Sequence, residues 1–253
     1  MRFVKPKLIT FDVTGTLLMT KVEKYYAAAG AQHGVLVDPS KLARSFKTNF
    51  KQISKEHPIF GKHTGMGSEK WWRTLVYAVF KDQISNIPEE KLSKVADTVI
   101  ECYRTRMCWE IYPGAVEILD YLQKEGILVG VISNFDDGLD SILQSLDIKS
   151  YFSFILCSYQ FGREKPDSQI FEEALRIFQN IKETHIFPQE ALHIGDRVDT
   201  DYLGAKNAKW NAIFIKRDDE PVDPLVSKYD IVSDLEDLKI NFEKDFSHSK
   251  VKT

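Results

Sequence analysis

Four polar residues follow short apolar runs, and their types are those that phosphoryl transfer needs. Asp12 follows LITF, Ser133 follows VGVI, Lys165 lies a few residues beyond FILCS, and Asp196 follows HIG. A carboxylate can attack phosphorus, a hydroxyl and a lysine can hold the transferring oxygens, and a second carboxylate can complete a site for a hard cation. If these side chains meet, covalent chemistry through an aspartyl phosphate is open to the chain.

The elements that must position these residues are predicted by the apolar runs themselves. The runs do not alternate with polar residues, which suits strands buried on both faces of a parallel sheet; they are Leu8–Phe11, Ile127–Ile132, Phe152–Leu156, Ala191–Ile194 and Ala212–Ile215. Segments of helical period separate the later runs, for example SQIFEEALRIF at 168–178. This alternation predicts an α/β fold with a doubly wound, Rossmann-like parallel sheet. Ligands bind at the carboxyl ends of such strands, where the four polar residues lie.

The first crossover is too long for a single helix, so we expect an inserted domain. Helix starts are indicated by Asp38-Pro39, by Ser68 as a cap and by Pro88. We therefore predict an all-helical domain over residues 20–108 and an α/β core made of residues 1–19 and 109–253. A helix from Pro113 to Gly126 returns the chain to the sheet. From Asn241 onward we expect a frayed tail.

Composition excludes several function classes. With 43% hydrophobic and 28% charged residues, the chain is expected to fold as an ordinary globular protein. A net charge of -3 provides no positive field for nucleic acid. No apolar run is long enough to span a membrane, and we see no signal-peptide core. Three irregularly spaced cysteines fit a reducing compartment, so we expect a cytoplasmic protein.

Four sequence motifs carry a resemblance to a known family. FDVTGTLL, VISN, KPD and GDRVDTDYLGA, in this order and spacing, resemble the four motifs of the haloacid dehalogenase superfamily. The likeness spans residues 7–215, and the insert after the first motif resembles the helical cap of the first type in that family. Each motif alone is weak, but four in order on predicted strand ends are specific. KWWRTLV, VISNFDDGLDSIL and REKPDSQIFEEAL resemble more narrowly a eukaryotic group of this superfamily.

The resemblance implies a role for each matching residue. Asp12 would be the nucleophile, Lys165 would neutralise the crowded negative charges, and Ser133 and Asn134 would bind the phosphoryl group. A Mg²⁺ ion would be held by Asp12, the backbone carbonyl of Thr14, Asp196 and Asp201. The implied substrate is a small phosphorylated molecule. Neither a nucleic-acid nor a membrane partner is expected, and the oligomeric state is left open.

Each of these residues also has an ordinary structural interpretation. Asp12 before TGT is able to cap a helix, and Ser133 is equally typical of a turn. Lys165 fits a solvated loop, and Asp199 fits a helix cap. His193 lies inside a predicted strand, where a hydrogen-bonded core histidine is the expected state. Only the ordered combination of motifs favours the catalytic interpretation over these.

Thr14 departs from a pattern that many phosphatases of the superfamily share. They carry DxD in the first motif, and the second acid protonates the leaving group. A threonine hydroxyl donates a hydrogen bond but does not release its proton near neutral pH. General acid–base assistance is typically worth about 10² to 10⁴ in rate. Leaving groups that need no proton, such as acyl phosphates, phosphoanhydrides and aryl phosphates, would therefore be favoured.

Thr14 leaves other interpretations open. A cap residue, His57 or His63, would supply the acid if the polar stretch KEHPIFGKHTGMGSEK covers the site. The protein would otherwise bind phosphorylated ligands with weak catalysis or none. Dehalogenases of the superfamily also lack the second acid, but they need no metal. Phosphonatases use a cap lysine as a Schiff base, for which Lys21 and Lys62 are the candidates; we rank both of these alternatives below phosphoryl transfer.

Overall fold

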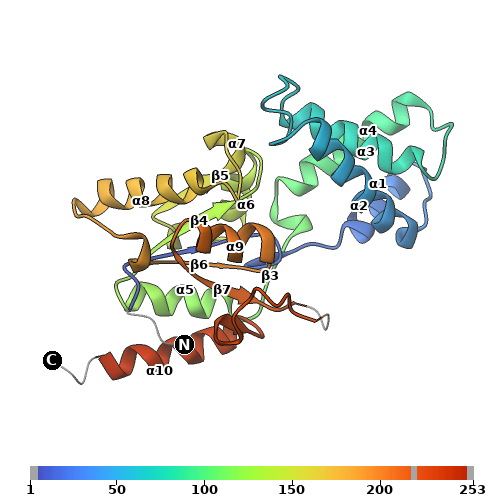
Figure 1. The fold of residues 1–253 in the computed structure, drawn as a ribbon. Coiled ribbons are helices and arrows are strands. Elements are labelled where there is room, and N and C mark those ends of the chain that lie inside the picture. The colour runs from blue at the N-terminus through green and yellow to red at the C-terminus, as the bar shows by residue number, and fades with distance from the viewer. Residues whose placement is uncertain (1–4, 218–220, 250–253) are drawn as a thin grey trace. The chain divides into compact units, whose positions relative to one another are not determined.

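The computed structural model describes residues 5–217 and 221–249, which form two compact units (Figure 1). The sheet unit contains the described residues of 1–19, 111–134 and 147–253. The helical unit contains residues 20–110 and 135–146. The chain therefore passes between the units four times, after residues 19, 110, 134 and 146. Each unit has its own fold and core.

The sheet unit is built on a parallel sheet of six strands in the order β5-β4-β1-β6-β7-β8. The strands are β1 (Leu8–Phe11), β4 (Leu128–Ser133), β5 (Phe154–Cys157), β6 (Ala191–Gly195), β7 (Asn211–Ile215) and β8 (Ile231–Val232). All residues of β1, β4 and β6 are buried, as the uninterrupted apolar runs predict. The five predicted strands are confirmed, and β8 adds a short edge strand.

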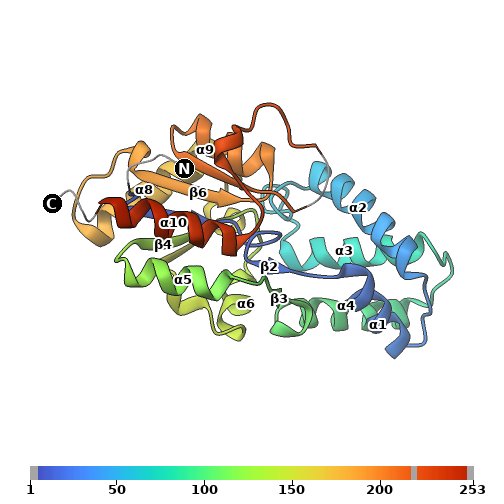
Figure 2. The same cartoon turned by 90° about the horizontal axis from the view of Figure 1, so that it is seen from below.

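Helices cover both faces of this sheet. Figure 1 shows α8 and α9 on one face and α5 and α10 on the other, and Figure 2 shows α5 and α10 side by side. The helices of the unit are α5 (Ala115–Lys124), α7 (Ser158–Phe161), α8 (Ser168–Lys182), α9 (Leu203–Asn207) and α10 (Leu235–Ser249). The predicted doubly wound α/β fold is thus confirmed. Strand β1 lies in the middle, between β4 and β6, so its carboxyl end is surrounded by other strand ends.

The helical unit packs four longer helices around aromatic and aliphatic side chains. They are α1 (Val22–Gln32), α2 (Pro39–Glu56), α3 (Ser68–Lys81) and α4 (Glu89–Tyr103); the short α6 (Leu139–Ser145) belongs to the same unit. Trp71, Leu75 and Val79 of α3 are fully buried, because they recur at helical spacing on one face. Asp38 caps α2 by accepting from the Ser40 backbone N–H at 2.9 Å, as predicted.

Two local predictions were wrong. The residue before α3 is Gly67, with φ +80°, and the Ser68 hydroxyl does not cap the helix but donates to Asp137 Oδ1 at 2.6 Å. The expected frayed tail is helical instead, because α10 buries Phe242 and Phe246 at 0% and 2% exposure. The last residues, 250–253, lie outside the described residues.

Short elements complete the described chain. Strands β2 (Leu18–Met19) and β3 (Glu110–Ile111) pair with each other where the chain leaves and re-enters the sheet unit. Turns of 3₁₀ type cover Arg106–Cys108, Lys149–Tyr151, Pro188–Glu190 and Lys228–Asp230, and a π-helical turn covers Val198–Tyr202. Within the residues that the structure describes, no helix has both the length and the apolar character that crossing a bilayer requires.

Candidate active site

Asp12 lies one residue beyond β1, and the register of the sheet brings it to the ends of neighbouring strands. Phe11 is level with Val131 of β4 and with Ile194 of β6. The Asp12 backbone N–H continues this ladder by donating to the Ile194 carbonyl at 2.9 Å. The Asp12 residue is 7% exposed, and the Ser133 hydroxyl donates to its Oδ1 at 2.9 Å. The sheet thus brings the predicted nucleophile and the predicted hydroxyl into direct contact.

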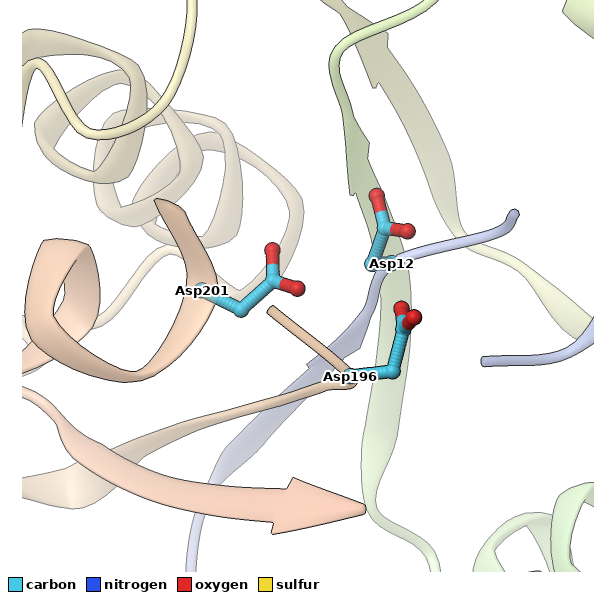
Figure 3. A group of neighbouring side chains, drawn as sticks. All are labelled: Asp12, Asp196 and Asp201. Atoms are coloured by element: carbon cyan, nitrogen blue, oxygen red, sulfur yellow. The ribbon is translucent and has the colours of Figure 1, made fainter. Parts of the chain in front are cut away.

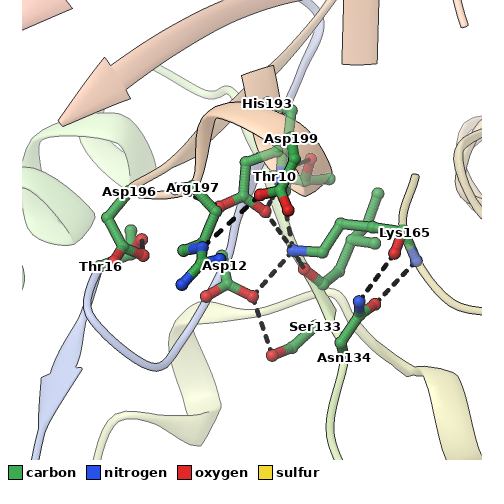
Figure 4. Close-up of polar contacts among 12 residues, drawn as sticks. Thr10, Asp12, Thr16, Ser133, Asn134, Lys165, His193, Asp196, Arg197 and Asp199 are labelled. Carbon is green, nitrogen blue, oxygen red and sulfur yellow. Dashed lines mark hydrogen bonds and ion pairs between the residues drawn. The ribbon is translucent and has the colours of Figure 1, made fainter. Parts of the chain in front are cut away.

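Lys165 reaches the same carboxylate from the loop between α7 and α8. Its Nζ lies 2.8 Å from Asp12 Oδ1 and 2.7 Å from Asp201 Oδ1, and it donates to the Ile132 carbonyl at 2.7 Å (Figure 4). Lys165 is 2% exposed, so burial alone would lower its pKa, but Asp12 and Asp201 raise the pKa above its ordinary value. The lysine therefore carries a buried positive charge between two carboxylates.

Asn134 fixes the backbone that carries this lysine. Its side-chain amide donates to the Lys165 carbonyl at 2.8 Å, and its Oδ1 accepts from the Lys165 N–H at 2.7 Å (Figure 4). Both amide atoms are therefore used on one residue 31 positions away in the sequence. In this arrangement Asn134 positions Lys165, and binding of a substrate by Asn134 stays a prediction.

Three carboxylates gather beside the lysine. Oxygens of Asp12, Asp196 and Asp201 lie within 4.8 Å of one another (Figure 3). Burial, followed by repulsion from Asp12 and Asp201, raises the pKa of Asp196 to about 7. Burial raises the pKa of Asp12 as well, with Lys165 opposing the shift. Burial would also raise the pKa of Asp201, but Lys165 and His193 overcome it and lower that pKa.

The backbone around these carboxylates leaves room for them. A Cβ atom on Gly15, which has φ +85°, would lie 2.2 Å from Asp196 Oδ2. A Cβ atom on Gly195 would lie 2.3 Å from the Asp201 carboxylate. Asp201 sits in the π-helical turn, and the Arg197 N–H donates to its Oδ2 at 2.9 Å. The close approach of an acid therefore requires glycine at both positions, and at Gly15 the positive φ requires it as well.

The donor set fits a hard divalent cation. Two buried carboxylates, Asp12 and Asp201, and the partly buried Asp196 lie beside the single positive charge of Lys165, so the acids outnumber the cation three to one. Carboxylate oxygens with further water ligands are what Mg²⁺ prefers. Asp12, Asp196 and Asp201 would hold such an ion. A ligand from the Thr14 backbone carbonyl stays a prediction.

The two threonines of the TGT motif lie in different surroundings. Thr14 is exposed and forms an isolated bridge with Leu18. Thr16 is fully buried, and its hydroxyl donates to Asp196 Oδ1 at 3.2 Å (Figure 4). Sequence reasoning concentrated on Thr14 and missed Thr16. The second threonine of DVTGT, two residues beyond the first, was the available signal.

His193 and Thr10 form a second contact that sequence reasoning did not identify. They are register partners on β6 and β1, and Thr10 Oγ1 lies 2.8 Å from His193 Nδ1. His193 Nε2 lies 3.4 Å from both Asp201 Oδ1 and Lys165 Nζ. Burial and the charge of Lys165 lower the pKa of His193. The predicted buried, hydrogen-bonded histidine is confirmed, but it also adjoins the charged cluster. The signal was one polar residue in each of two apolar strands, LITF and ALHIG.

The other residues singled out in the sequence lie outside this cluster. His57, His63, Lys21 and Lys62 all belong to the helical unit. His57 ends α2, and its Nδ1 lies 2.9 Å from Thr64 Oγ1. Asp199 shares the π-helical turn with Asp201, but its side chain is 69% exposed and lies 3.6 Å from Arg197 Nε. A role for any of these in catalysis rests on the sequence alone.

Comparison with known proteins decides the family. The family model described as haloacid dehalogenase-like hydrolase matches residues 6–209, which include the whole carboxylate cluster. The chain belongs to the haloacid dehalogenase-like hydrolase family. The resemblance drawn from four motifs is confirmed.

Curated relatives of this haloacid dehalogenase-like hydrolase include animal and fungal proteins. The rhythmically expressed gene 2 protein of Drosophila melanogaster is 40% identical over 219 residues, covering 83% of this chain and 82% of the relative. Haloacid dehalogenase-like hydrolase domain-containing protein 3 of Bos taurus is 32% identical over 222 residues, covering 87% and 85%. The narrower likeness to a eukaryotic group is thereby confirmed.

Solved structures show that this haloacid dehalogenase-like hydrolase shares its fold with proteins of differing titles. A 2-haloacid dehalogenase from Pseudomonas syringae has a TM-score of 0.64 at 24% identity, covering 94% of this chain and 99% of that one. A putative hydrolase of the same superfamily from Bacillus subtilis, bound to magnesium, has a TM-score of 0.69 at 16% identity, covering 96% and 100%. At these identities the comparison establishes the fold and leaves the reaction open.

Proposed function

We propose that this haloacid dehalogenase-like hydrolase is a Mg²⁺-dependent phosphohydrolase that transfers a phosphoryl group from a small molecule to Asp12 and then to water. The observation that carries the proposal is the buried network in which Lys165 bridges Asp12 and Asp201 while Asp196 adjoins both acids. Dehalogenation needs no such set of acids around a nucleophile. The magnesium named for the Bacillus subtilis relative supports the choice of cation.

The residues of the chain have separate tasks in this reaction. Among the described residues, the hydrogen bonds to the Asp12 carboxylate go to Oδ1, from Ser133 and Lys165. This arrangement orients Oδ2 as the attacking atom. Lys165 and Ser133 stand beside the nucleophile, where they can also donate to the phosphoryl oxygens. A bound Mg²⁺ would supply further positive charge to offset the phosphoryl group and the three carboxylates.

The two chemical steps balance without a general acid from Thr14. In the first, Asp12 Oδ2 forms a bond to phosphorus while the bond to the leaving oxygen breaks, and that oxygen leaves with the electron pair. In the second, water attacks phosphorus, the bond to Asp12 breaks with its electron pair returning to the carboxylate, and the product leaves as dihydrogen phosphate, which keeps both protons of the water. Thr14 cannot protonate the first leaving group. Substrates with weakly basic leaving groups, such as acyl, aryl or anhydride phosphates, therefore suit this site best.

The test is Mg²⁺-dependent phosphate release from a panel of acyl, aryl and sugar phosphates. The wild type should hydrolyse the acyl and aryl phosphates, and Asp12→Asn should abolish the activity. Thr14→Asp should extend turnover to sugar phosphates by up to about 10²-fold, because it restores an acid at that position. If Asp12→Asn retains wild-type activity, the proposal is wrong.

A second candidate function is binding of a phosphorylated ligand with little or no turnover. The observation that favours it is the exposed Thr14 in the position of the usual acid. It would be supported if the wild type binds Mg²⁺ and phosphate but releases no phosphate from the panel. The dehalogenase hypothesis is tested by measuring chloride release from 2-chloro acids alongside the phosphate panel. The phosphonatase hypothesis, in which Lys21 or Lys62 forms a Schiff base, is tested by trapping that Schiff base with borohydride.

We also propose that the protein acts in the cytoplasm. No disulfide is assigned to Cys102, Cys108 or Cys157, as a reducing compartment favours. Fractionation of cells expressing the untagged chain tests this placement. Recovery in a membrane or organelle fraction would overturn it.

A further inference from the structure

Arg217 follows β7 and binds a loop from the other end of the sequence. Its Nε donates to the Gly15 carbonyl at 2.7 Å, and its Nη2 donates to the Thr16 carbonyl at 2.7 Å. Its Cζ also lies 3.8 Å from the centre of the Tyr112 ring. Two parallel hydrogen bonds and a stacked ring fix both the position and the plane of the guanidinium. The carbonyls it binds belong to the first motif, directly beyond the nucleophile.

The loop that Arg217 holds is the one that adjoins the carboxylate cluster. Within it, the Gly15 N–H donates to the Leu18 carbonyl at 2.8 Å and the Leu17 N–H donates to the Val13 carbonyl at 2.9 Å. The Thr16 hydroxyl donates to Asp196, and Gly15 lies so close to the Asp196 carboxylate that no Cβ fits. A shift of a few tenths of an ångström in this loop would therefore change the position of Asp196.

Tyr112 connects the same arginine to the point where the chain re-enters the sheet unit. Its ring stacks on Arg217, and its backbone N–H donates to the Leu17 carbonyl at 2.9 Å. Arg217 is half-buried, and burial lowers the pKa of its guanidinium. Removing water from a guanidinium is unfavourable, and bonds to two carbonyls offset this less than an ion pair would. We therefore expect Arg217 to contribute more to the position of the loop than to the stability of the fold.

We propose that Arg217 is a positioning residue for the Mg²⁺ site. It holds the loop of residues 13–18 so that Gly15 and the Thr16 hydroxyl keep their places beside Asp196. The inference rests on the proposed function, because it assumes that a cation binds at Asp12, Asp196 and Asp201. It adds a residue outside the four motifs, contributed by the end of β7.

The inference distinguishes arginine from lysine at this position. A lysine keeps the charge but has no rigid fork, so it cannot donate to two adjacent carbonyls in one plane and stack on Tyr112 at once. Loss of a residue that orients metal ligands typically reduces metal affinity or activity by about 10 to 100-fold. We expect Arg217→Ala to lower Mg²⁺ affinity or activity by this whole factor. Arg217→Lys should recover only part of that loss.

The experiment is calorimetric titration of Mg²⁺ into the full chain, for wild type, Arg217→Ala and Arg217→Lys. Two control variants are titrated in parallel. Arg176→Ala removes an exposed arginine of α8 that pairs with Glu173. Phe242→Leu lowers stability through a buried residue of α10, far in sequence from the loop. Thermal unfolding is measured for every variant, so that affinity is compared at matched stability. Aryl phosphate turnover at saturating Mg²⁺ is the second measurement.

The expected result is a Kd for Mg²⁺ about 10-fold or more above wild type in Arg217→Ala, with both controls near wild type. Turnover should fall mainly in kcat, because the loop positions the reacting groups. If wild type itself binds no Mg²⁺, the proposed function fails. If wild type binds Mg²⁺ and both Arg217 variants match Phe242→Leu in affinity and kcat, the proposed function stands and the positioning role is overturned. Should Arg217→Ala not fold, Arg217→Lys decides the question alone.

Discussion

The two units of the chain both have apolar cores, but they differ in the charged groups buried beside them. At the end of its central strand the sheet unit buries Asp12, Lys165 and Asp201, each 7% exposed or less. The helical unit buries aromatic rings instead, and Trp71 is fully buried with ring contacts to Phe50 and Phe60 at 5.3 Å and 5.2 Å. Both interiors are packed with apolar side chains, and the sheet unit adds a buried cluster of ion pairs at its strand ends.

A catalytic role explains the buried charges of the sheet unit better than a contribution to stability does. Burying aromatic surface stabilises a fold in proportion to its area, and paired rings add to this. Burying charged groups is unfavourable unless they are paired, and replacing such pairs with apolar residues is often stabilising. The helical unit also buries one acid, Asp136, but it is bonded by the Gly138 N–H at 2.6 Å and by Trp72 Nε1. The sheet unit therefore buries several charged groups together at its strand ends, whereas Asp136 of the helical unit is bound by neutral donors.

The largest expected effect comes from removing the cation of the sheet unit. Lys165→Met removes the cation that Asp12 and Asp201 share and leaves them only neutral hydrogen-bond partners, so phosphate release should be lost and unfolding free energy should fall by about 3–5 kcal/mol. Urea unfolding and a turnover assay measure the two effects. Lys94→Met, which removes an exposed lysine paired with Glu90, is the matched control and should change neither. If Lys165→Met is as stable as the wild type, the ion pairs of Lys165 with Asp12 and Asp201 do not stabilise the sheet unit.

Truncation of the aromatic core should affect stability without affecting the cation site. Trp71→Ala removes a fully buried ring from α3 and should lower the unfolding free energy by about 3–5 kcal/mol. Trp71→Phe keeps most of the volume and should cost clearly less. Mg²⁺ affinity, measured at a temperature where each variant is folded, should stay at the wild-type value. A parallel loss of affinity would contradict the separation of the two interiors.

Added Mg²⁺ should stabilise the protein through the sheet unit. At 100 times its Kd, a ligand that binds only the folded state adds about 2.7 kcal/mol to the unfolding free energy. Asp196→Ala should abolish this gain, whereas Asp199→Ala should keep it, because Asp199 lies outside the cluster. Urea unfolding with Mg²⁺ or with EDTA measures the difference. Equal responses of the two variants would place the cation elsewhere.

The smallest effect is expected where a neutral hydrogen bond supports the charged cluster. Thr10→Val keeps the shape of the side chain but leaves His193 Nδ1 without its partner at 2.8 Å, so unfolding free energy should fall by about 1–2 kcal/mol. Thr10→Ser, which keeps the hydroxyl, should recover most of the loss. Urea unfolding of the three proteins side by side checks this. No difference between valine and serine would show that the hydroxyl contributes nothing.

Sequence reasoning succeeded where local pattern determines position. The apolar runs predicted the strands of the sheet, and parallel strands share one carboxyl edge, so Asp12 and Ser133 could be expected to meet. It was less successful where the path of a loop decides. Arg217 reaches Gly15 across 202 positions, and no periodicity encodes that contact. Lys165, 153 positions from Asp12, was expected beside it from its place beyond an apolar run and from the order of the motifs, and the two side chains do meet.

The wrong predictions for Ser68 and for the tail after Asn241 have a similar cause. Ser68 has the residue type of a cap, but its hydroxyl bonds to Asp137, 69 positions away, and Gly67 supplies the turn. The tail after Asn241 is polar enough to suggest fraying, but Phe242 and Phe246 find a buried environment. Tertiary contacts override local preference in both places. The sequence alone also gave no sign that residues 135–146 join the helical unit.

The chain crosses between its two units four times, and this limits how one unit can be exchanged for that of a relative. An insertion that leaves and returns once can be removed or exchanged as a cassette. Here the deletion of residues 20–110 would leave residues 135–146 behind, with Asp136 and Asp137 deprived of Trp72 and Ser68. Those residues begin directly after Ser133 and Asn134. Transplanting the helical unit between relatives therefore requires two segments to be exchanged together.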